Sequence, residues 1–296
     1  MEKVRGITNG AKSKNEVCKM KLTVLVDNNT LIDKNYFGEP GLSYFIEEEE
    51  YKILFDVGYS DVFIRNAHKM GIHLQNINFV ILSHGHLDHT WGMSHLIGNL
   101  NYFGQENNRK PITLIAHPLA LCSKIDEGEQ IGFIYSEEAL KACFDFQLSR
   151  KPLWISKKLV FLGEIERVNG FENRRPLGIT VENGIPKEDF LLDDSALVYK
   201  ADKGLVIITG CSHSGICNII EYAKKICQEE RILDVIGGFH LLKPSETQME
   251  GTLEYMNKIQ PGFVHACHCT DLDSKIALSK VVNLKEVGVG TELVYD

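Results

Sequence analysis

The chain lacks long hydrophobic segments and any surplus of positive charge. Its longest apolar runs have the length of a β-strand, and residues 1–19 are polar and basic, so we expect neither a membrane span nor a secretory signal. Lys and Arg total 32 against 40 Asp and Glu, which gives a formal net charge of −8. Nucleic-acid-binding surfaces usually carry a basic patch. The charge therefore does not favour a nucleic-acid partner, although that alternative stays open.

The sequence also lacks a disulfide framework. Its eight cysteines are scattered over 296 residues, a pattern that favours a reducing compartment and predicts a cytoplasmic protein. A Cys-x-x-Cys-x-x-Cys run is missing, which argues against an iron–sulfur ferredoxin. With 44% hydrophobic and 24% charged residues, the composition is that of a folded globular protein.

What the chain does have is a dense cluster of metal-ligating residue types. Residues 83–90 contain three histidines and one aspartate within six positions: His84, His86, Asp88 and His89. This segment directly follows residues 77–82, a mostly apolar run that predicts a buried strand. Residues two apart on an extended segment face the same way, so His84 and His86 can converge on one ion. Imidazole and carboxylate ligands suit zinc, iron or manganese. We interpret the motif as half of a site for one or two metal ions.

The remaining periodicity predicts alternating strands and helices. Apolar, β-branched runs predict strands at residues 22–27, 42–47, 51–56, 112–116, 205–209, 232–236 and 263–266. Helical spacing predicts helices at residues 60–70, 90–100, 214–227, 247–259 and 274–281. This pattern indicates a sheet covered by helices.

Histidines follow several of these strands. His213, His240 and His268 come after three late strands, and loops at strand ends commonly carry functional residues. His117 follows the strand at 112–116 and precedes a proline. It is either a ligand or substrate contact, or a packing residue before a short helix.

These motifs resemble those of the metallo-β-lactamase superfamily, whose signature has the pattern His84-x-His86-x-Asp88-His89. Residues 209–215 (Thr-Gly-Cys-Ser-His-Ser-Gly), 237–241 (Gly-Gly-Phe-His-Leu) and 267–270 (Cys-His-Cys-Thr) resemble a subgroup similar to archaeal dihydropteroate synthase-like enzymes of methanopterin biosynthesis. The resemblance implies a four-layer αββα sandwich. It spans a single domain at residues 21–296, with a flexible leader at 1–20 and an insertion or lid at about 122–152.

The resemblance also implies a ligand set. The superfamily pattern continues with a His, a bridging Asp and a His, each at a strand end; His213 and His268 fit the outer places, whereas His240 stands where the Asp is expected. One metal is assigned to His84, His86 and His213, and a second to Asp88, His89 and His268. One or two divalent ions are expected, zinc first, with manganese or iron as alternatives. Asp56 is expected to hydrogen-bond a ligand histidine from behind.

Several roles stay open. His240 is either a general acid or phosphate contact, our preference, or a metal ligand. Asp194 is either a replacement acid or a turn residue, and Cys211 is either a thiolate ligand or a packing residue. Cys267 and Cys269 flank His268 and, on an extended segment, would point away from it as buried small side chains.

The expected function is that of a metal-dependent hydrolase. Metal-activated water near the catalytic Asp88 would attack a phosphoester, with phosphodiesters preferred and a small-molecule or nucleotide-like substrate. A first alternative is a synthase that joins a pterin diphosphate to an aminobenzene ribotide. Further alternatives are a di-iron redox protein and a non-catalytic sensor, and the sequence does not indicate an oligomeric state.

Overall fold

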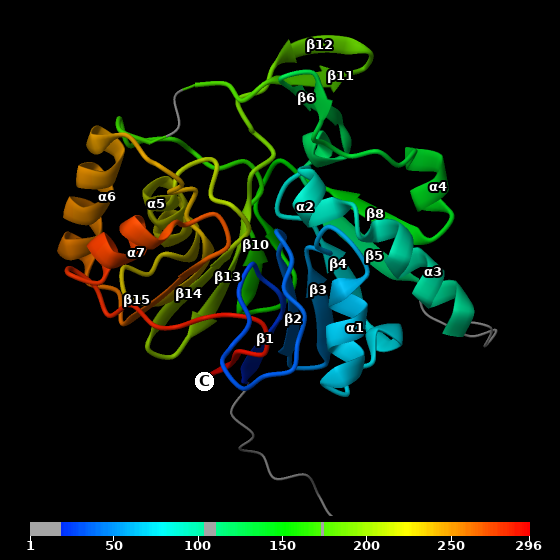
Figure 1. Cartoon of the computed structure of the whole chain (residues 1–296), viewed down its shortest axis with the longest axis horizontal. Coiled ribbons are helices and arrows are strands. Elements are labelled where there is room, and N and C mark those ends of the chain that lie inside the picture. The colour runs from blue at the N-terminus through cyan, green and yellow to red at the C-terminus, as the bar shows by residue number, and fades with distance from the viewer. Residues whose placement is uncertain (1–18, 104–110, 173–174) are drawn as a thin grey trace, which may run out of the picture.

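Two large β-sheets packed face to face form the centre of the molecule (Figure 1). The computed structural model describes residues 19–103, 111–172 and 175–296. Nearly all of the leader expected at 1–20 therefore lies outside the described residues, and the first strand begins at Met20. Within the described ranges, no helix is both long and apolar enough to cross a membrane.

The first sheet has seven strands in the order β17-β1-β2-β3-β4-β5-β8. Its β1, β2, β3 and β17 are antiparallel, whereas β3, β4, β5 and β8 run parallel. The strands expected at 42–47 and 51–56 are confirmed, and they pair as a hairpin of β2 and β3. The strands are β1 (Met20–Val26), β2 (Ser43–Glu48), β3 (Tyr51–Phe55), β4 (Phe79–Ile81), β5 (Ile112–Ala116), β8 (Phe144–Leu148) and β17 (Glu292–Tyr295).

The second sheet has six strands in the order β16-β15-β14-β13-β10-β9. Its β14, β15 and β16 are parallel, so the carboxyl ends of these three strands meet at one edge. The strands are β9 (Leu153–Trp154), β10 (Leu159–Phe161), β13 (Ala196–Ala201), β14 (Gly204–Thr209), β15 (Ile232–Gly238) and β16 (Phe263–Cys267).

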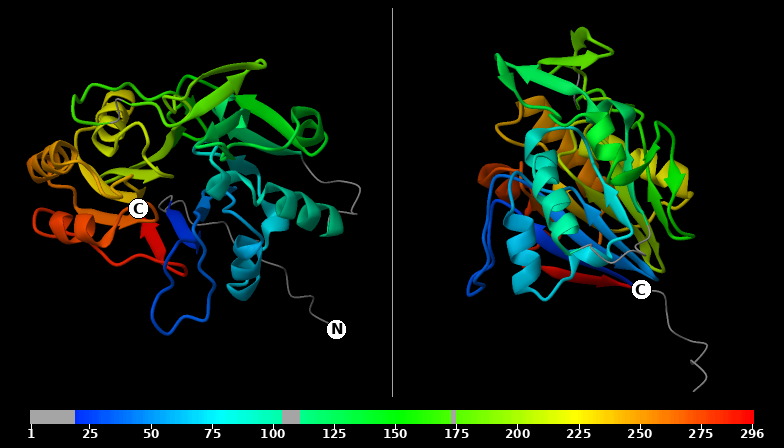
Figure 2. Two further views of the ribbon diagram at one scale, coloured as in Figure 1. Left: turned by 45° about the horizontal axis from the view of Figure 1, so that its top comes forward. Right: turned by 90° about the vertical axis from the view of Figure 1, so that its right-hand side faces the viewer.

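Helices cover the outer face of each sheet (Figure 2). On the first sheet lie α1 (Val62–Lys69), α3 (Met93–Phe103) and α4 (Glu137–Lys141), and on the second α5 (Ile216–Cys227), α6 (Glu246–Ile259) and α7 (Leu272–Leu278). The short α2 (Leu87–Thr90) lies within the histidine motif, and two 3₁₀ turns occupy η1 (Leu74–Asn76) and η2 (Pro118–Leu121). The helix expected at 90–100 is thus two helices. They separate at Gly92, where a Cβ atom would lie 2.0 Å from the Val57 carbonyl oxygen.

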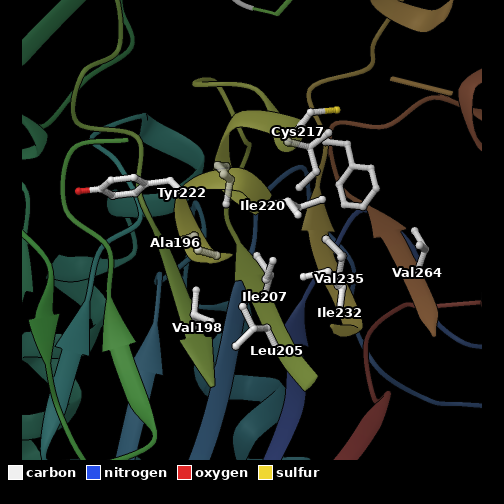
Figure 3. Close-up of a cluster of buried hydrophobic side chains, with 14 of the residues drawn as sticks. Ala196, Val198, Leu205, Ile207, Cys217, Ile220, Tyr222, Ile232, Val235 and Val264 are labelled. Carbon is white, nitrogen blue, oxygen red and sulfur yellow. The ribbon is translucent and has the colours of Figure 1, made fainter. Parts of the chain in front are cut away.

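The alternation along β14 shows how the layers are held together. Leu205 and Ile207 pack with α5 in the outer core (Figure 3), whereas Val206 and Ile208 pack in the core between the two sheets. All four side chains are fully buried, and each such burial stabilises the fold by about 1.5–3 kcal/mol. A third core joins the first sheet to its helices. These three cores separate four layers, which confirms the αββα sandwich.

A small third sheet, visible at the top of Figure 1, has the order β12-β11-β6-β7. Its strands are β6 (Ser123–Asp126), β7 (Glu129–Gln130), β11 (Ile179–Glu182) and β12 (Ile185–Glu188). The segment expected as a lid at 122–152 divides between this sheet and β8 of the first large sheet. Its action as a lid stays a prediction.

Candidate metal centre

The histidine motif follows β4 and brings two imidazoles onto a third from the second sheet. The rings of His84, His86 and His213 lie 4.7–4.8 Å apart, centroid to centroid. The Nε2 atoms of His84 and His86 and both ring nitrogens of His213 are buried and have no hydrogen-bond partner. Buried polar atoms are normally satisfied, so this convergence of orphaned nitrogens fits a metal ion.

Burial also keeps these three imidazoles neutral, which is the form that binds metals. Desolvation holds the pKa of His84 and of His213 well below its usual range, and it lowers the pKa of His86 to about 4. The set is therefore ready to bind a cation at neutral pH.

A second cluster lies beside the first. Ligand atoms of Asp88, His89, Cys211 and His268 all lie within 4.8 Å of one another, and His268 Nε2 is 3.2 Å from both His89 Nε2 and Asp88 Oδ2. Burial alone would lower the pKa of His89, but Asp88 and Asp56 raise it to about 9, so a metal ion bound at neutral pH would displace the proton on its Nε2. Crowded donors of this kind, with a carboxylate among them, also fit a divalent cation.

One buried carboxylate orients ligands of both clusters. Asp56 Oδ2 accepts from His89 Nδ1 at 2.7 Å and from Ser83 Oγ at 2.6 Å, and Ser83 Oγ lies 2.9 Å from His84 Nδ1. Such partners fix the tautomer and would turn each Nε2 toward a bound metal ion. The expected hydrogen bond between Asp56 and a histidine of the motif is confirmed.

Two side chains position His268, and neither was among the expected site residues. Its Nδ1 lies 3.0 Å from Asn28 Oδ1, and its backbone N–H donates to Asp27 Oδ1 at 2.9 Å. Both partners follow β1 directly. A cluster of Asp and Asn just after an apolar strand was the signal that could have indicated them.

A buried ion network holds the loop that carries His84 and His86. The backbone N–H of Gly85 donates to Asp193 Oδ2 at 2.8 Å, and Asp193 Oδ1 accepts from Lys124 Nζ at 2.9 Å. Lys124 Nζ also donates to Asp189 Oδ2 at 2.7 Å. The ammonium comes from β6, so the small third sheet is tied to the metal loop.

Two of the open candidates lie outside both clusters. Asp194 is buried, which raises its pKa to about 6, and its Oδ2 accepts from the backbone N–H and hydroxyl of Ser214. His117 Nδ1 accepts from the backbone N–H of Leu119 at 3.1 Å and caps η2, while its Nε2 lies 3.3 Å from Glu164 Oε2. Each therefore stabilises a neighbouring loop.

His240 lies at the rim. Its ring centroid is 4.2 Å from that of His213, its backbone N–H donates to Cys269 Sγ at 3.2 Å, and its side chain belongs to neither cluster. The expectation that Cys269 points away from His268 was wrong, because His268 has φ 49° and breaks the extended alternation. Cys267 packs between the sheets against Tyr44, as expected.

The two clusters open onto a cavity of about 760 Å³, lined by His86, Asp88, His240 and His268. A second cavity of about 370 Å³ lies beyond His213 and His240 and includes Arg175 on its wall. Both volumes lie in or near the range of small-molecule sites. His213 and His240 line both spaces.

Comparison with known proteins identifies the class. The sequence profile of the metallo-beta-lactamase superfamily matches residues 36–102. Uncharacterized protein MJ0448 of Methanocaldococcus jannaschii is 30% identical over 91% of this chain and 98% of its own length. The chain belongs to the metallo-β-lactamase superfamily, and the resemblance seen in the motifs is confirmed.

Two further relatives narrow the comparison. The 7,8-dihydropterin-6-methyl-4-(beta-D-ribofuranosyl)-aminobenzene-5'-phosphate synthase of the same archaeon is 29% identical over 86% of this chain and 89% of that protein. Tm1679, described as a metal-dependent hydrolase of the beta-lactamase superfamily, superposes with a TM-score of 0.78 at 28% identity, covering 94% of this chain and all of that one.

Proposed function

We propose that the protein is a metal-dependent hydrolase that cleaves a phosphoester, with phosphodiesters as the preferred class. The observation that carries the proposal is the pair of adjacent ligand clusters facing one cavity, with buried imidazole nitrogens that have no protein partner. Paired metal sites suit in-line displacement at phosphorus, because both the attacking and the leaving oxygen need charge stabilisation.

The proposed ligand set assigns His84, His86 and His213 to one divalent ion. It assigns Asp88, His89 and His268 to the other. Imidazole and carboxylate donors fit zinc, and manganese or iron can take the same set. When bound, such ions act as Lewis acids and lower the pKa of a coordinated water to about 7.

Asp88 and His240 are the proposed catalytic groups. Although burial opposes ionisation, the imidazoles of His89 and His268 lower the pKa of Asp88, so its carboxylate stays charged and can accept a hydrogen bond from the attacking water and orient it. Burial also opposes the charged form of His240, but the neighbouring Cys269 raises the pKa of its imidazole. A protonated His240 at the rim can donate to the leaving alkoxide.

The proposed substrate is a small molecule or a nucleotide-like phosphoester, because the main cavity of about 760 Å³ has small-molecule size. A cytoplasmic location is part of the proposal. It is supported by the cysteines in the described part of the chain, all of which are free.

The test is hydrolysis of bis(p-nitrophenyl) phosphate by protein reconstituted with zinc or manganese. We expect metal-dependent turnover. His86→Ala should lower the turnover rate at least about 100-fold, because removing a group that only orients a metal ligand already lowers metal affinity or activity by about 10–100-fold. His95→Ala is the matched control, because His95 lies exposed on α3. Metal-loaded protein without turnover would reject the phosphodiesterase.

A second candidate is the synthase reaction, which joins a pterin diphosphate to an aminobenzene ribotide. The relative named as such a synthase supports it, and so do the two cavities that share His213 and His240 in their lining, which offer space for two reactants. Release of diphosphate only when both reactants are present would support this function, in protein that leaves bis(p-nitrophenyl) phosphate intact.

A further inference from the structure

We infer that the thiolate of Cys211 bridges the two metal positions and takes the place of the superfamily's bridging carboxylate. The inference rests on the metal site proposed above and adds a ligand to it. It concerns which side chain joins the two ions, and therefore which metals the protein selects.

Two groups of potential metal ligands converge among the described residues, and Cys211 is the one side chain that both contain. Its Sγ lies within 4.8 Å of the ligand atoms of Asp88, His89 and His268, and also of those of His84 and His213. It is 3.2 Å from His89 Nε2.

Cys211 is buried, with 4% of its surface exposed. The other candidate bridging residues contact different partners. Asp194 Oδ2 accepts from Ser214, while its Oδ1 is buried without a partner in the described part of the chain. Neither Asp194 nor His240 belongs to a group of converging ligand atoms. His240 follows β15, where the sequence analysis expected the bridge, but the bridging place is supplied one strand earlier, by the residues after β14.

The backbone explains this shift. After β14 the chain passes Gly210, where a Cβ atom would lie 2.1 Å from Ser83 Oγ and 3.1 Å from Asp56 Oδ2. Only glycine permits this approach, and it brings the next residue between ligands of both clusters. Ser212 then adopts φ 57° and donates its hydroxyl to the Gly238 carbonyl at 2.6 Å, which returns His213 to the same site.

A second sulfur nearby provides an internal control. Cys269 Sγ accepts from the backbone N–H of His240 at 3.2 Å and donates to the carbonyl of Cys211 at 3.4 Å. It belongs to neither cluster. A thiolate bridge would favour softer ions such as zinc, iron and cobalt over manganese and magnesium, because sulfur is a soft ligand.

The test is titration of metal-free full-length protein with Co²⁺, which reports sulfur ligation through a thiolate-to-cobalt charge-transfer absorption. We expect the band in the wild type and in Cys269→Ser. We expect Cys211→Ser to lose the band and to bind the second equivalent at least about tenfold more weakly. Cys211→Asp should recover binding of both equivalents without the band, because a carboxylate can bridge.

A band that persists in Cys211→Ser, or that disappears in Cys269→Ser, would overturn the assignment. Recovery by Cys211→Asp separates a lost ligand from a misfolded variant, and wild-type affinity for the second equivalent in Cys211→Ser would also refute the bridge. The readout is independent of turnover. Protein that shows the band but leaves phosphodiesters intact would retain Cys211 as the bridge and reject the proposed hydrolase.

Discussion

Replacing Lys124 by methionine should destabilise the protein strongly at neutral pH. The ammonium is 1% exposed and contacts Asp189 and Asp193 at 2.7 and 2.9 Å. Each contact has a gross Coulomb energy of about 6 kcal/mol at an effective dielectric constant of 20, most of which offsets desolvation. Removing one partner of a buried network leaves uncompensated charge, so we expect a loss of about 3–5 kcal/mol in the free energy of unfolding.

Urea denaturation at two pH values would measure this loss. Without Lys124 the folded-state pKa of both carboxyls lies above its unfolded value, so the penalty is present at high pH and diminishes as they protonate. The difference in free energy of unfolding between the wild type and Lys124→Met should therefore be smaller at pH 5 than at pH 7. Lys187→Met is the matched control, because its ion pair with Glu182 on the same small sheet is exposed and should contribute less than about 1 kcal/mol. Equal effects of the two substitutions would refute the reasoning.

Three further outcomes are expected. Asp56→Asn should weaken metal binding by about 10–100-fold, measured by competition with a chelator, because this carboxylate orients two imidazoles. Gly210→Ala should cost about 1–3 kcal/mol in urea denaturation through its clash with Ser83, whereas Gly98→Ala, with no atom within 4 Å, should be neutral or stabilising. The pKa of His86 falls from 6.5 to about 4 on folding. The free energy of unfolding of the metal-free protein should therefore decrease by about 3 kcal/mol through this residue as the pH falls from 6.5 to 4. Thermal unfolding of His86→Leu should show a flatter pH dependence.

The layers of the fold could be predicted because the amino-acid composition of the strands indicates which of their faces are buried. Every residue of β14 is buried, and its uninterrupted apolar run indicated a strand covered on both faces. The helix boundary at Gly92 could not be predicted in this way. At this boundary the backbone N–H of Val57 donates to the His89 carbonyl at 2.9 Å and that of Gly92 to the Gly58 carbonyl at 3.1 Å, and these partners are distant in sequence and carry no local signal.

The site was predictable where residues are close in sequence and less so where they are not. His84, His86, Asp88 and His89 form a motif that can be identified directly. Lys124 was missed because a single lysine in a short polar segment looks exposed. Its burial depends on carboxylates 65 and 69 residues further along the chain.

The two proposed metal positions would not be independent of each other in this architecture. Asp56 orients His89 in one cluster directly and His84 in the other through the Ser83 hydroxyl, and Cys211 lies near possible ligands of both positions. An ion bound at either position would therefore fix groups that the other position uses. Because the first ion would bear the cost of ordering these shared groups, the second should bind to a more preorganised site, and mutual repulsion of the cations would be lowered by the anionic groups between them.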